Sequence, residues 1–547
     1  MRRNENAEAL RTGGGQDPAS RAVSTPAAEA PPAKVLPLFV GLMMALLMFS
    51  LNQTILATAL PTVAGELHGV GSMLWVSTAF MLAATIMMPV YGKLGDMIGR
   101  KPLFIFAISA FMCGSLVGVL AQDMNTLIIG RVVQGIGGGG LLILSQALIA
   151  DVVPARERGK YMGVLGSVFA VSSVAGPLLG GWFTEGPGWR WTFWMNFPLG
   201  AMALIAAIFF LKVPRTARRE KMRFDIGGAM CTSLMTVLIT LIGVWGGNRF
   251  PWLSWQIAAM AAGLVLVIAL LVVVERRASE PILPPRLFRD RTFLLATAAG
   301  LCIGILMFGV VGYLPTYLQM AMELSATAAG LHMVPLMGGM LVVSSAVGFL
   351  VSRTGRYKAF PLVGVILITA AAVLLSTVDE HSSDLVVGAY LGVMGIGLGM
   401  SMQLLVLVVQ NAFPSSMVGT ATASNNYFRQ VGATLGMGLV GSIFTTRLLN
   451  RLGDAVPGGD VAGSSVQALT PGMIAQLPAN VRDAVMAAYT EALMPLYLYL
   501  APLGVLGVAL LVFLPHKPLA TKIDRQRSVM DTGSLQQVEA APQPAKR

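Results

Sequence analysis

The sequence predicts an all-α, polytopic membrane protein. Of its 547 residues, 55% are hydrophobic and only 12% are charged, which is about half the charge of a typical soluble domain. The mean hydropathy is +0.71, and the apolar residues gather in runs of about 20, the length at which an α-helix spans a bilayer. Such a chain has too little charge to cover a water-exposed surface, so its partner is the lipid bilayer.

Fourteen apolar runs are expected to be transmembrane helices, although the least separated neighbours leave 13 or 15 spans open. An even number returns both chain ends to the same side of the membrane. The expected spans are residues 36–59, 72–91, 103–121, 126–149, 160–182, 191–211, 226–245, 255–274, 293–319, 328–350, 360–377, 385–409, 418–446 and 492–514.

The basic residues predict which side of the membrane the ends occupy. With both termini in the cytoplasm, the cytoplasmic tails and loops hold 31 of the 38 Lys and Arg residues, and the external loops hold five. This asymmetry follows the positive-inside rule and accounts for the net charge of +12 without a nucleic-acid partner. Residues 1–34 and 523–547 contain no apolar run, so we expect disordered cytoplasmic tails there.

An internal repeat divides the chain into two halves. Two glycines seven residues apart, followed by arginine, occur in Gly92–Arg100 after the second run and in Gly348–Arg356 after the tenth. Each segment is predicted to be a short cytoplasmic loop in a six-helix unit, and paired units are common in secondary transporters. The predicted parts are an N-terminal half at 35–212, two inserted spans with basic loops at 213–292, and a C-terminal half at 293–522 with an external loop at 448–490.

Three short motifs resemble those of a known membrane-protein family. In chain order they are Gly92-Lys-Leu-Gly-Asp96-Met-Ile-Gly99-Arg100-Lys101, Arg131-Val-Val-Gln134-Gly135 and Gly176-Pro177-Leu-Leu-Gly180-Gly181. They are similar to motifs A, B and C of the major facilitator superfamily. Trp189–Gly200 and Glu280–Phe288 are similar to segments of its 14-span drug:proton antiporter branch. The resemblance covers nearly all of residues 36–515.

This resemblance implies the major facilitator fold, with two six-helix halves and two inserted spans, in the bacterial cytoplasmic membrane. It implies a secondary transporter that exports small amphiphilic compounds, antibiotics included, by alternating access and in exchange for protons. No cofactor, metal or catalytic residue is expected, and nothing in the sequence requires more than a monomer. The alternative is a dedicated exporter of an endogenous neutral or anionic metabolite or lipid. A membrane enzyme is disfavoured because the longest external loop contains no His or Cys.

Motif A contains a candidate gating residue, Asp96. The positive-inside rule explains the Arg and Lys of a cytoplasmic segment but no acid. The carboxylate can pair with Arg100 or face the positive end of a helix from the other half, near Ser415. We therefore expect a latch that holds one gate closed; a solvated turn is the alternative. The residues of this latch motif are Gly92, Asp96, Gly99, Arg100 and Lys101.

Arg131 is the most informative residue within a predicted span. A charge inside the membrane is costly and usually faces the interior of the bundle, so we expect Arg131 and Gln134 to act in transport or coupling. An arginine satisfied only by helix carbonyls is the alternative. In the family, an Asp of the first span lies near this arginine and takes part in proton coupling, but this sequence has Asn52 at that position.

The predicted spans have no carboxylate in their apolar cores. The nearest acids lie at span edges: Asp151, Glu185, Asp225, Asp384 and Glu491. Proton coupling would then use His332, which titrates near neutral pH, an edge acid, or a proton of the substrate; a packed, structural histidine is the alternative. Arg429 is a weaker candidate than Arg131 for a role in transport or coupling, because its long side chain can extend to the membrane interface. A cavity with Arg131 and no acid favours neutral or anionic substrates over lipophilic cations.

The glycine-rich stretches are predicted to serve packing. Gly135–Gly140 fits the pattern G-x-G-x-x-G, but no strand precedes it, so no dinucleotide site is expected. Small residues at this density let helices approach closely in a membrane. Motif C, with Gly176, Pro177, Gly180 and Gly181, is expected to provide a bend or a close contact in its span.

Overall fold

The computed structural model describes residues 35–69, 72–211, 224–247, 249–379, 382–455 and 479–520. Within these ranges the chain forms helices and no β-strand. Thirteen of the helices there are long and apolar enough to cross a membrane, and one apolar helix is shorter. They follow the fourteen predicted runs in order, which confirms the predicted all-α membrane fold. The tails expected at 1–34 and 523–547 lie outside the described residues.

The first half contains six spans. They are α1 (Val35–Glu66), α2 (Met73–Ile98), α3 (Arg100–Leu120), α4 (Met124–Val152), α5 (Ala155–Glu185) and a sixth divided into α6 (Trp191–Trp194) and α7 (Asn196–Phe209). Two further helices, α8 (Ile226–Trp245) and α9 (Trp255–Arg277), follow as an antiparallel pair.

The second half starts with the short 3-10 helix η3 (Leu287–Arg289). Two of its six spans are divided, into α10 with α11 and α12 with α13. The helices are α10 (Arg291–Val311), α11 (Leu314–Met320), α12 (Ala326–His332), α13 (Val334–Thr354), α14 (Ala359–Leu375), α15 (Asp384–Ala412), α16 (Val418–Ala455) and α18 (Ala479–Val512).

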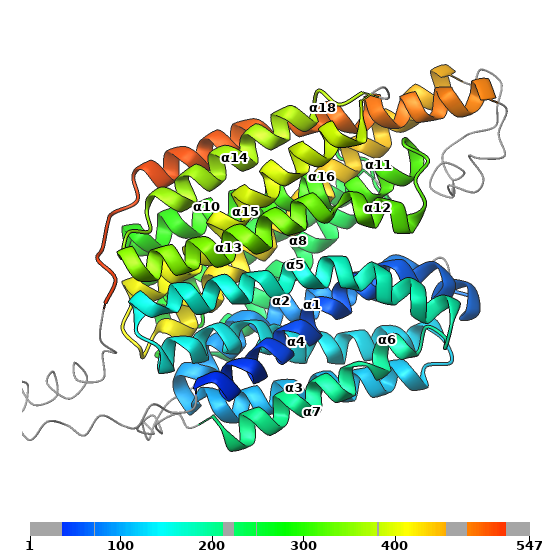
Figure 1. Ribbon diagram of the computed structural model, residues 1–547. Helices are drawn as coiled ribbons and strands as arrows, with labels where there is room; N and C mark the ends of the chain where they lie inside the picture. The colour runs from blue at the N-terminus through cyan, green and yellow to red at the C-terminus, as the bar shows by residue number, and fades with distance from the viewer. Residues whose placement is uncertain are drawn as a thin grey trace, which may run out of the picture.

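The two halves lie side by side, as Figure 1 shows, with α2 against α16 and α5 against α13. Each half has its own apolar core. The start of α1 (dark blue) and the segment that follows α18 (red) lie at the same end of the bundle, on the left in Figure 1, which we call the tail end. The opposite end is the far end.

The inserted pair α8–α9 packs beside the seam between the halves. α8 contacts both α2 and α16, and Cys231 and Met235 of α8 share an apolar cluster with Tyr427 and Val431 of α16. The pair therefore touches both halves, although it belongs to the core of neither.

The two repeat segments predicted as loops are helical, so that part of the prediction is wrong. α2 runs through Asp96 to Ile98 and α3 begins at Arg100, so only Gly99 (φ +95°) separates them. α13 likewise ends at Thr354, directly before Gly355, which has φ +74°. Apolar runs mark only the part of a helix that lies in the apolar region of the membrane, whereas the helix itself can continue beyond it. Positive φ is cheap only for glycine, so the repeated glycines mark helix ends.

The predicted external loop at 448–490 is also shorter than expected. α16 continues to Ala455 and α18 begins at Ala479, so both margins of the loop are helical. Its middle, residues 456–478, lies outside the part of the chain that the structure describes, as does the basic stretch 212–223.

Motif B glycines place α4 directly against the backbones of two neighbours. A Cβ on Gly135 or Gly139 would lie 2.5 Å from Phe80 O or 2.3 Å from Ala84 O, both on α2. A Cβ on Gly137 would lie 2.4 Å from a backbone oxygen of α3. These distances are shorter than van der Waals contact, which confirms the predicted close packing and gives no room for a dinucleotide.

Motif C supplies a matched pair of glycines for a stability test. A Cβ on Gly180 would lie 2.1 Å from Thr58 Oγ1 and 2.6 Å from Ile55 O of α1, whereas one on Gly181 would meet nothing within 4 Å. We expect Gly180→Ala to destabilise the protein by about 1–3 kcal/mol through overpacking. Gly181→Ala should be neutral or stabilising by up to about 1 kcal/mol because alanine favours the helix. Thermal unfolding of the two variants, followed by gel filtration, measures this; equal midpoints would contradict it.

Candidate transport site

Arg131 of α4 is buried at the centre of a polar network in the first half. Its side chain is 1% exposed. Nη1 donates to Asn52 Oδ1 of α1 and to Gln134 Oε1 (2.8 Å), and Nε donates to Val76 O of α2 (3.1 Å). The guanidinium carbon lies 4.2 Å from the centroid of the Phe80 ring, within the range of a cation–π contact. The predicted residues Asn52, Arg131 and Gln134 are thus brought together.

The network continues through a serine to the sixth span. Gln134 Nε2 and Asn196 Nδ2 both donate to Ser115 Oγ of α3, at 2.8 and 3.1 Å. Asn196 begins α7, directly after the break in this span, and its Oδ1 is buried without a partner. A serine can bond the carbonyl four residues earlier on its own helix, as Ser115 Oγ does with Phe111 O at 2.9 Å, so the sequence does not single out Ser115.

The charge of Arg131 is not neutralised by an acid. Its hydrogen-bond acceptors are two amides and a backbone carbonyl, and the ion pairs in the described part of the chain do not include it. A buried, unpaired charge is expensive in a low-dielectric interior. The site therefore keeps a positive field that attracts anionic or electron-rich groups.

A second cluster of buried amides joins α4 to α15 and α16 of the other half. Asn426 Nδ2 donates to Gln146 Oε1 (2.8 Å), Gln410 Nε2 donates to Gln146 O (3.2 Å), and Gln146 Nε2 lies 3.5 Å from Gln403 Oε1. Arg429 donates to Asn426 Oδ1, so it ends in this cluster. The three glutamines were not predicted, although polar residues in apolar runs are a usable signal.

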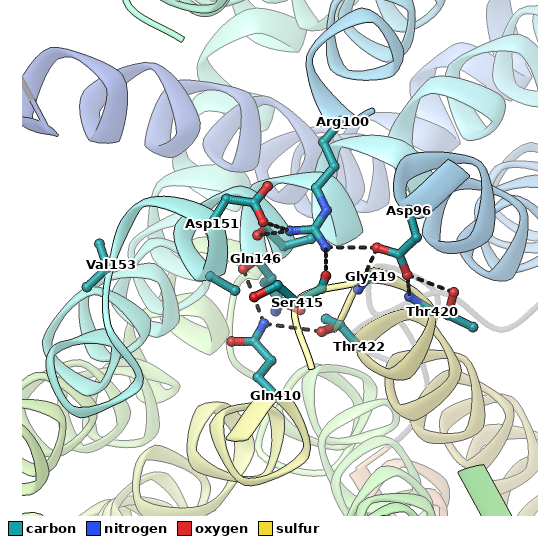
Figure 2. A network of polar contacts seen from close by, with 12 residues as sticks. Asp96, Arg100, Gln146, Asp151, Val153, Gln410, Ser415, Gly419, Thr420 and Thr422 are labelled. Carbon is teal, nitrogen blue, oxygen red and sulfur yellow. Dashed lines mark hydrogen bonds and ion pairs between the residues drawn. The ribbon is translucent and has the colours of Figure 1, made fainter. Parts of the chain in front are cut away.

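Asp96 connects the halves at the tail end (Figure 2). Its Oδ1 accepts from Arg100 Nη2 (2.8 Å) and Gly419 N (3.1 Å), and its Oδ2 accepts from Thr420 N (2.7 Å) and Thr420 Oγ1 (2.8 Å). Because α16 begins at Val418, the carboxylate of one half caps the positive end of a helix in the other. Both contacts considered from the sequence are present.

Arg100 holds Asp96 in place and extends the contact. Its guanidinium donates to Asp151 Oδ1 and to Ala147 O (2.6 Å) of α4, and Nη2 lies 3.4 Å from Ser415 O of the other half. Asp151, an edge acid in the sequence, is therefore part of this cluster. Lys101 points elsewhere, since its Nζ donates to Ile208 O of α7 at 2.8 Å.

His332 lies apart from both networks, at the break between α12 and α13. Its Nε2 is 3.3 Å from Asp384 Oδ2 at the start of α15, and its Nδ1 is 3.0 Å from Ala328 O. Motif C is also separate: Gly176 and Gly180 pack on α1, and Pro177 lies within α5. The structure thus does not join these residues to Arg131.

In the described part of the chain, the two halves are joined by hydrogen bonds near the tail end. Besides the contacts of Asp96 and Gln146 given above, Ser344 Oγ donates to Gly163 O (2.9 Å) and Arg156 Nη2 donates to Arg353 O (3.0 Å). Toward the far end the ribbons of the two halves diverge (right in Figure 1). The structure is therefore closed by polar contacts at one end.

A helical bundle of two halves, latched at one end and holding a buried cation in a polar network, defines a membrane transporter. The chain belongs to the Major Facilitator Superfamily, whose model matches residues 42–225 and 222–437. This confirms the resemblance seen in the motifs.

Curated relatives are named as transporters. An uncharacterised MFS-type transporter of Mycobacterium tuberculosis is 38% identical over 88% of this chain and 70% of its own length. Multidrug resistance protein 3 of Bacillus subtilis is 34% identical over 76% of this chain and 81% of its own length. The acurin A biosynthesis cluster MFS-type transporter of Aspergillus aculeatus is 31% identical over 77% of this chain and 77% of its own length.

Solved structures share the fold. The human organic anion transporter MFSD10 superposes with a TM-score of 0.58 at 16% identity, covering 88% of this chain and 99% of its own. The proton:xylose symporter XylE superposes with a TM-score of 0.57 at 14% identity, covering 89% of this chain and 97% of its own.

Neutralising Asp96 tests the contact between the halves. We expect Asp96→Asn to weaken closure of the tail end by about 1–2 kcal/mol, because it removes the charge from a helix cap. That is roughly a 5- to 30-fold change in population. In a background without Cys113, Cys231 and Cys302, a cysteine replacing the buried Thr422 should react faster with a maleimide applied from the tail end.

Asp123→Asn is the matched control. Asp123 also caps a helix, accepting from Thr126 N at 2.9 Å, but it does so within one half. Its replacement should leave the labelling rate unchanged. Equal rates in Asp96→Asn and the unmodified background would contradict a closing role for Asp96.

Proposed function

We propose that this protein exports small amphiphilic compounds across the bacterial cytoplasmic membrane by alternating access, driven by the proton gradient. Relatives named as multidrug transporters support the class of substrate. The observation that carries the proposal is Arg131, a buried cation whose described partners are all uncharged. Its field favours neutral and anionic amphiphiles over lipophilic cations.

The tail end is proposed to face the cytoplasm. The basic residues concentrate on that side under the predicted topology, as the positive-inside rule requires. Under this orientation, the Asp96 cap on α16 would close the protein to the cytoplasm. Export would require the cap to break, so that the halves rock and substrate enters from the cytoplasmic side.

A dedicated exporter of an endogenous neutral or anionic metabolite is the second candidate. Two observations favour it. Arg131 and Arg429 both have amide rather than carboxylate partners, and a relative is named for a biosynthesis cluster. Both candidates use the same site and differ in the range of substrates, so one panel of compounds separates them.

Inverted membrane vesicles with an imposed pH gradient, reported by a quenching dye, test the proposal. We expect neutral and anionic amphiphiles to dissipate the gradient, and Arg131→Ala to lower their transport by at least about tenfold, equivalent to roughly 1.4 kcal/mol. Gln134→Ala, which keeps the charge but removes one acceptor, should have a smaller effect. Substrate movement with an unchanged gradient would refute proton coupling but leave transport intact.

Asn52→Asp tests the sign of the field. The new carboxylate would accept from Arg131 and neutralise it, so lipophilic cations should gain transport relative to anions in the same vesicles. Asn125→Asp, at the start of α4, adds the same charge outside the Arg131 network and is the control. An unchanged preference between cations and anions in Asn52→Asp would count against an electrostatic role of Arg131.

A further inference from the structure

Two carboxyl groups, one of them buried, meet where the inserted helix pair joins the bundle. Asp225 caps the start of α8, with Oδ1 accepting from Gly228 N at 2.8 Å. Glu275 lies in the last turns of α9, is 4% exposed, and accepts from Leu283 N through Oε1 at 3.0 Å. A Cβ on Gly228 would lie 2.3 Å from Asp225 Oδ2 and 2.8 Å from Glu275 Oε1. The two carboxyl groups are thus neighbours across a glycine.

Each of these groups has an oxygen without a hydrogen-bond donor. Asp225 Oδ2 and Glu275 Oε2 are buried and unpartnered. Thr232, one turn further along α8 from Gly228 and 2% exposed, also has an unpartnered hydroxyl. Residues four apart share a helix face, so a third polar atom lies on the same side of α8. This is a buried site whose polar atoms lack a partner.

The chemistry of the pair identifies the missing partner. Ionised carboxylates accept hydrogen bonds but cannot donate them, and neighbouring like charges disfavour double ionisation. A single proton turns one group into a donor toward the other, so it removes both the repulsion and the unsatisfied acceptors. We propose that Asp225 and Glu275 form a proton-binding site in which the two carboxyl groups share one proton.

The surrounding groups leave this proton in place. On α2, the ammonium of Lys93 is already paired with Glu280 at 2.6 Å. Cys231 is the further titratable group facing the pair from α8, and α16 presents Tyr427, whose hydroxyl lies 2.8 Å from Thr236 Oγ1. Arg276 and Arg277 of α9 are exposed, unlike Glu275. Asp225 is only half-buried, so part of this residue reaches the surface of the protein.

Proton loss at this site would act on the latch helix. The pair would gain a negative charge beside α2, which packs against α8 and carries Lys93 three residues before Asp96. Lys93 could then form an ion pair either with the ionised Asp225–Glu275 pair or with Glu280. Protonation of the inserted hairpin would thereby bias the contact of α2 with α16. This consequence rests on the proposed function; the proton site does not.

Infrared spectroscopy of the full-length protein in membranes tests the site directly. At neutral pH we expect the C=O band of a protonated carboxylic acid, lost in both Asp225→Asn and Glu275→Gln. Both variants should fold, because an amide can donate to the remaining carboxylate. Asp123→Asn, which removes a carboxylate that caps α4 and takes no part in this cluster, should keep the band. A band absent from the native protein, or present in both pair variants, would overturn the proposal.

Two further measurements separate the alternatives. Sodium titration should not change the band; its loss on adding Na⁺ would make this a metal-cation site and overturn the proton assignment. In the vesicle assay, Glu275→Gln should still move substrate but lose dissipation of the pH gradient, whereas Asp123→Asn should retain both. Unchanged dissipation in Glu275→Gln with an infrared band that is lost would keep the proton site and reject its part in coupling.

Discussion

Lipid offers no hydrogen bonds, and this constraint governs where each polar group of the bundle lies. Arg131 is not satisfied by one neighbour but by groups from α1, α2 and α4, with Ser115 and Asn196 supporting Gln134 behind it. Removing water makes these contacts stronger and the cost of leaving one unmade higher. The same constraint makes each unsatisfied atom, such as Asn196 Oδ1, conspicuous.

The seam between the halves is built from two kinds of contact. Small residues bring backbones together: a Cβ on Gly163 would lie 2.4 Å from Ser344 O. Polar contacts then hold the tail end, through Asp96 on α16 and Gln146 on Asn426. Such contacts can break as the halves separate, because each partner can be hydrated once the tail end opens. A wholly apolar seam would lack this reversibility.

The inserted hairpin acquires a role beyond adding two spans. α8 touches α2 and α16, which carry the two sides of the Asp96 contact. A carboxyl pair lies at the base of this hairpin, outside the two six-helix halves. The apolar cores of the predicted spans contain no acid. Charge changes there reach the latch through Lys93 without placing an acid beside Arg131.

Much of the fold follows from the sequence alone. Runs of about 20 apolar residues determine the spans, since only a helix satisfies its own backbone in lipid. The basic residues predict an orientation, and the motif residues predicted that Asp96 would be near Arg100 or a helix of the other half. Asn52 and Arg131 could be paired only through the resemblance to a family, because they are far apart in the chain.

Tertiary structure decided what polarity alone leaves open. Gln146, Gln403 and Gln410 were single polar residues in long apolar runs, and only packing of α4 against α15 and α16 makes them one cluster. Asp225 was named only as an acid at a span edge and Glu275 was not singled out, and only the hairpin places them around Gly228. A hydropathy pattern is one-dimensional and records how far a residue lies along its helix. It carries no information about which helix each face meets, and the chemistry of this protein depends on those faces.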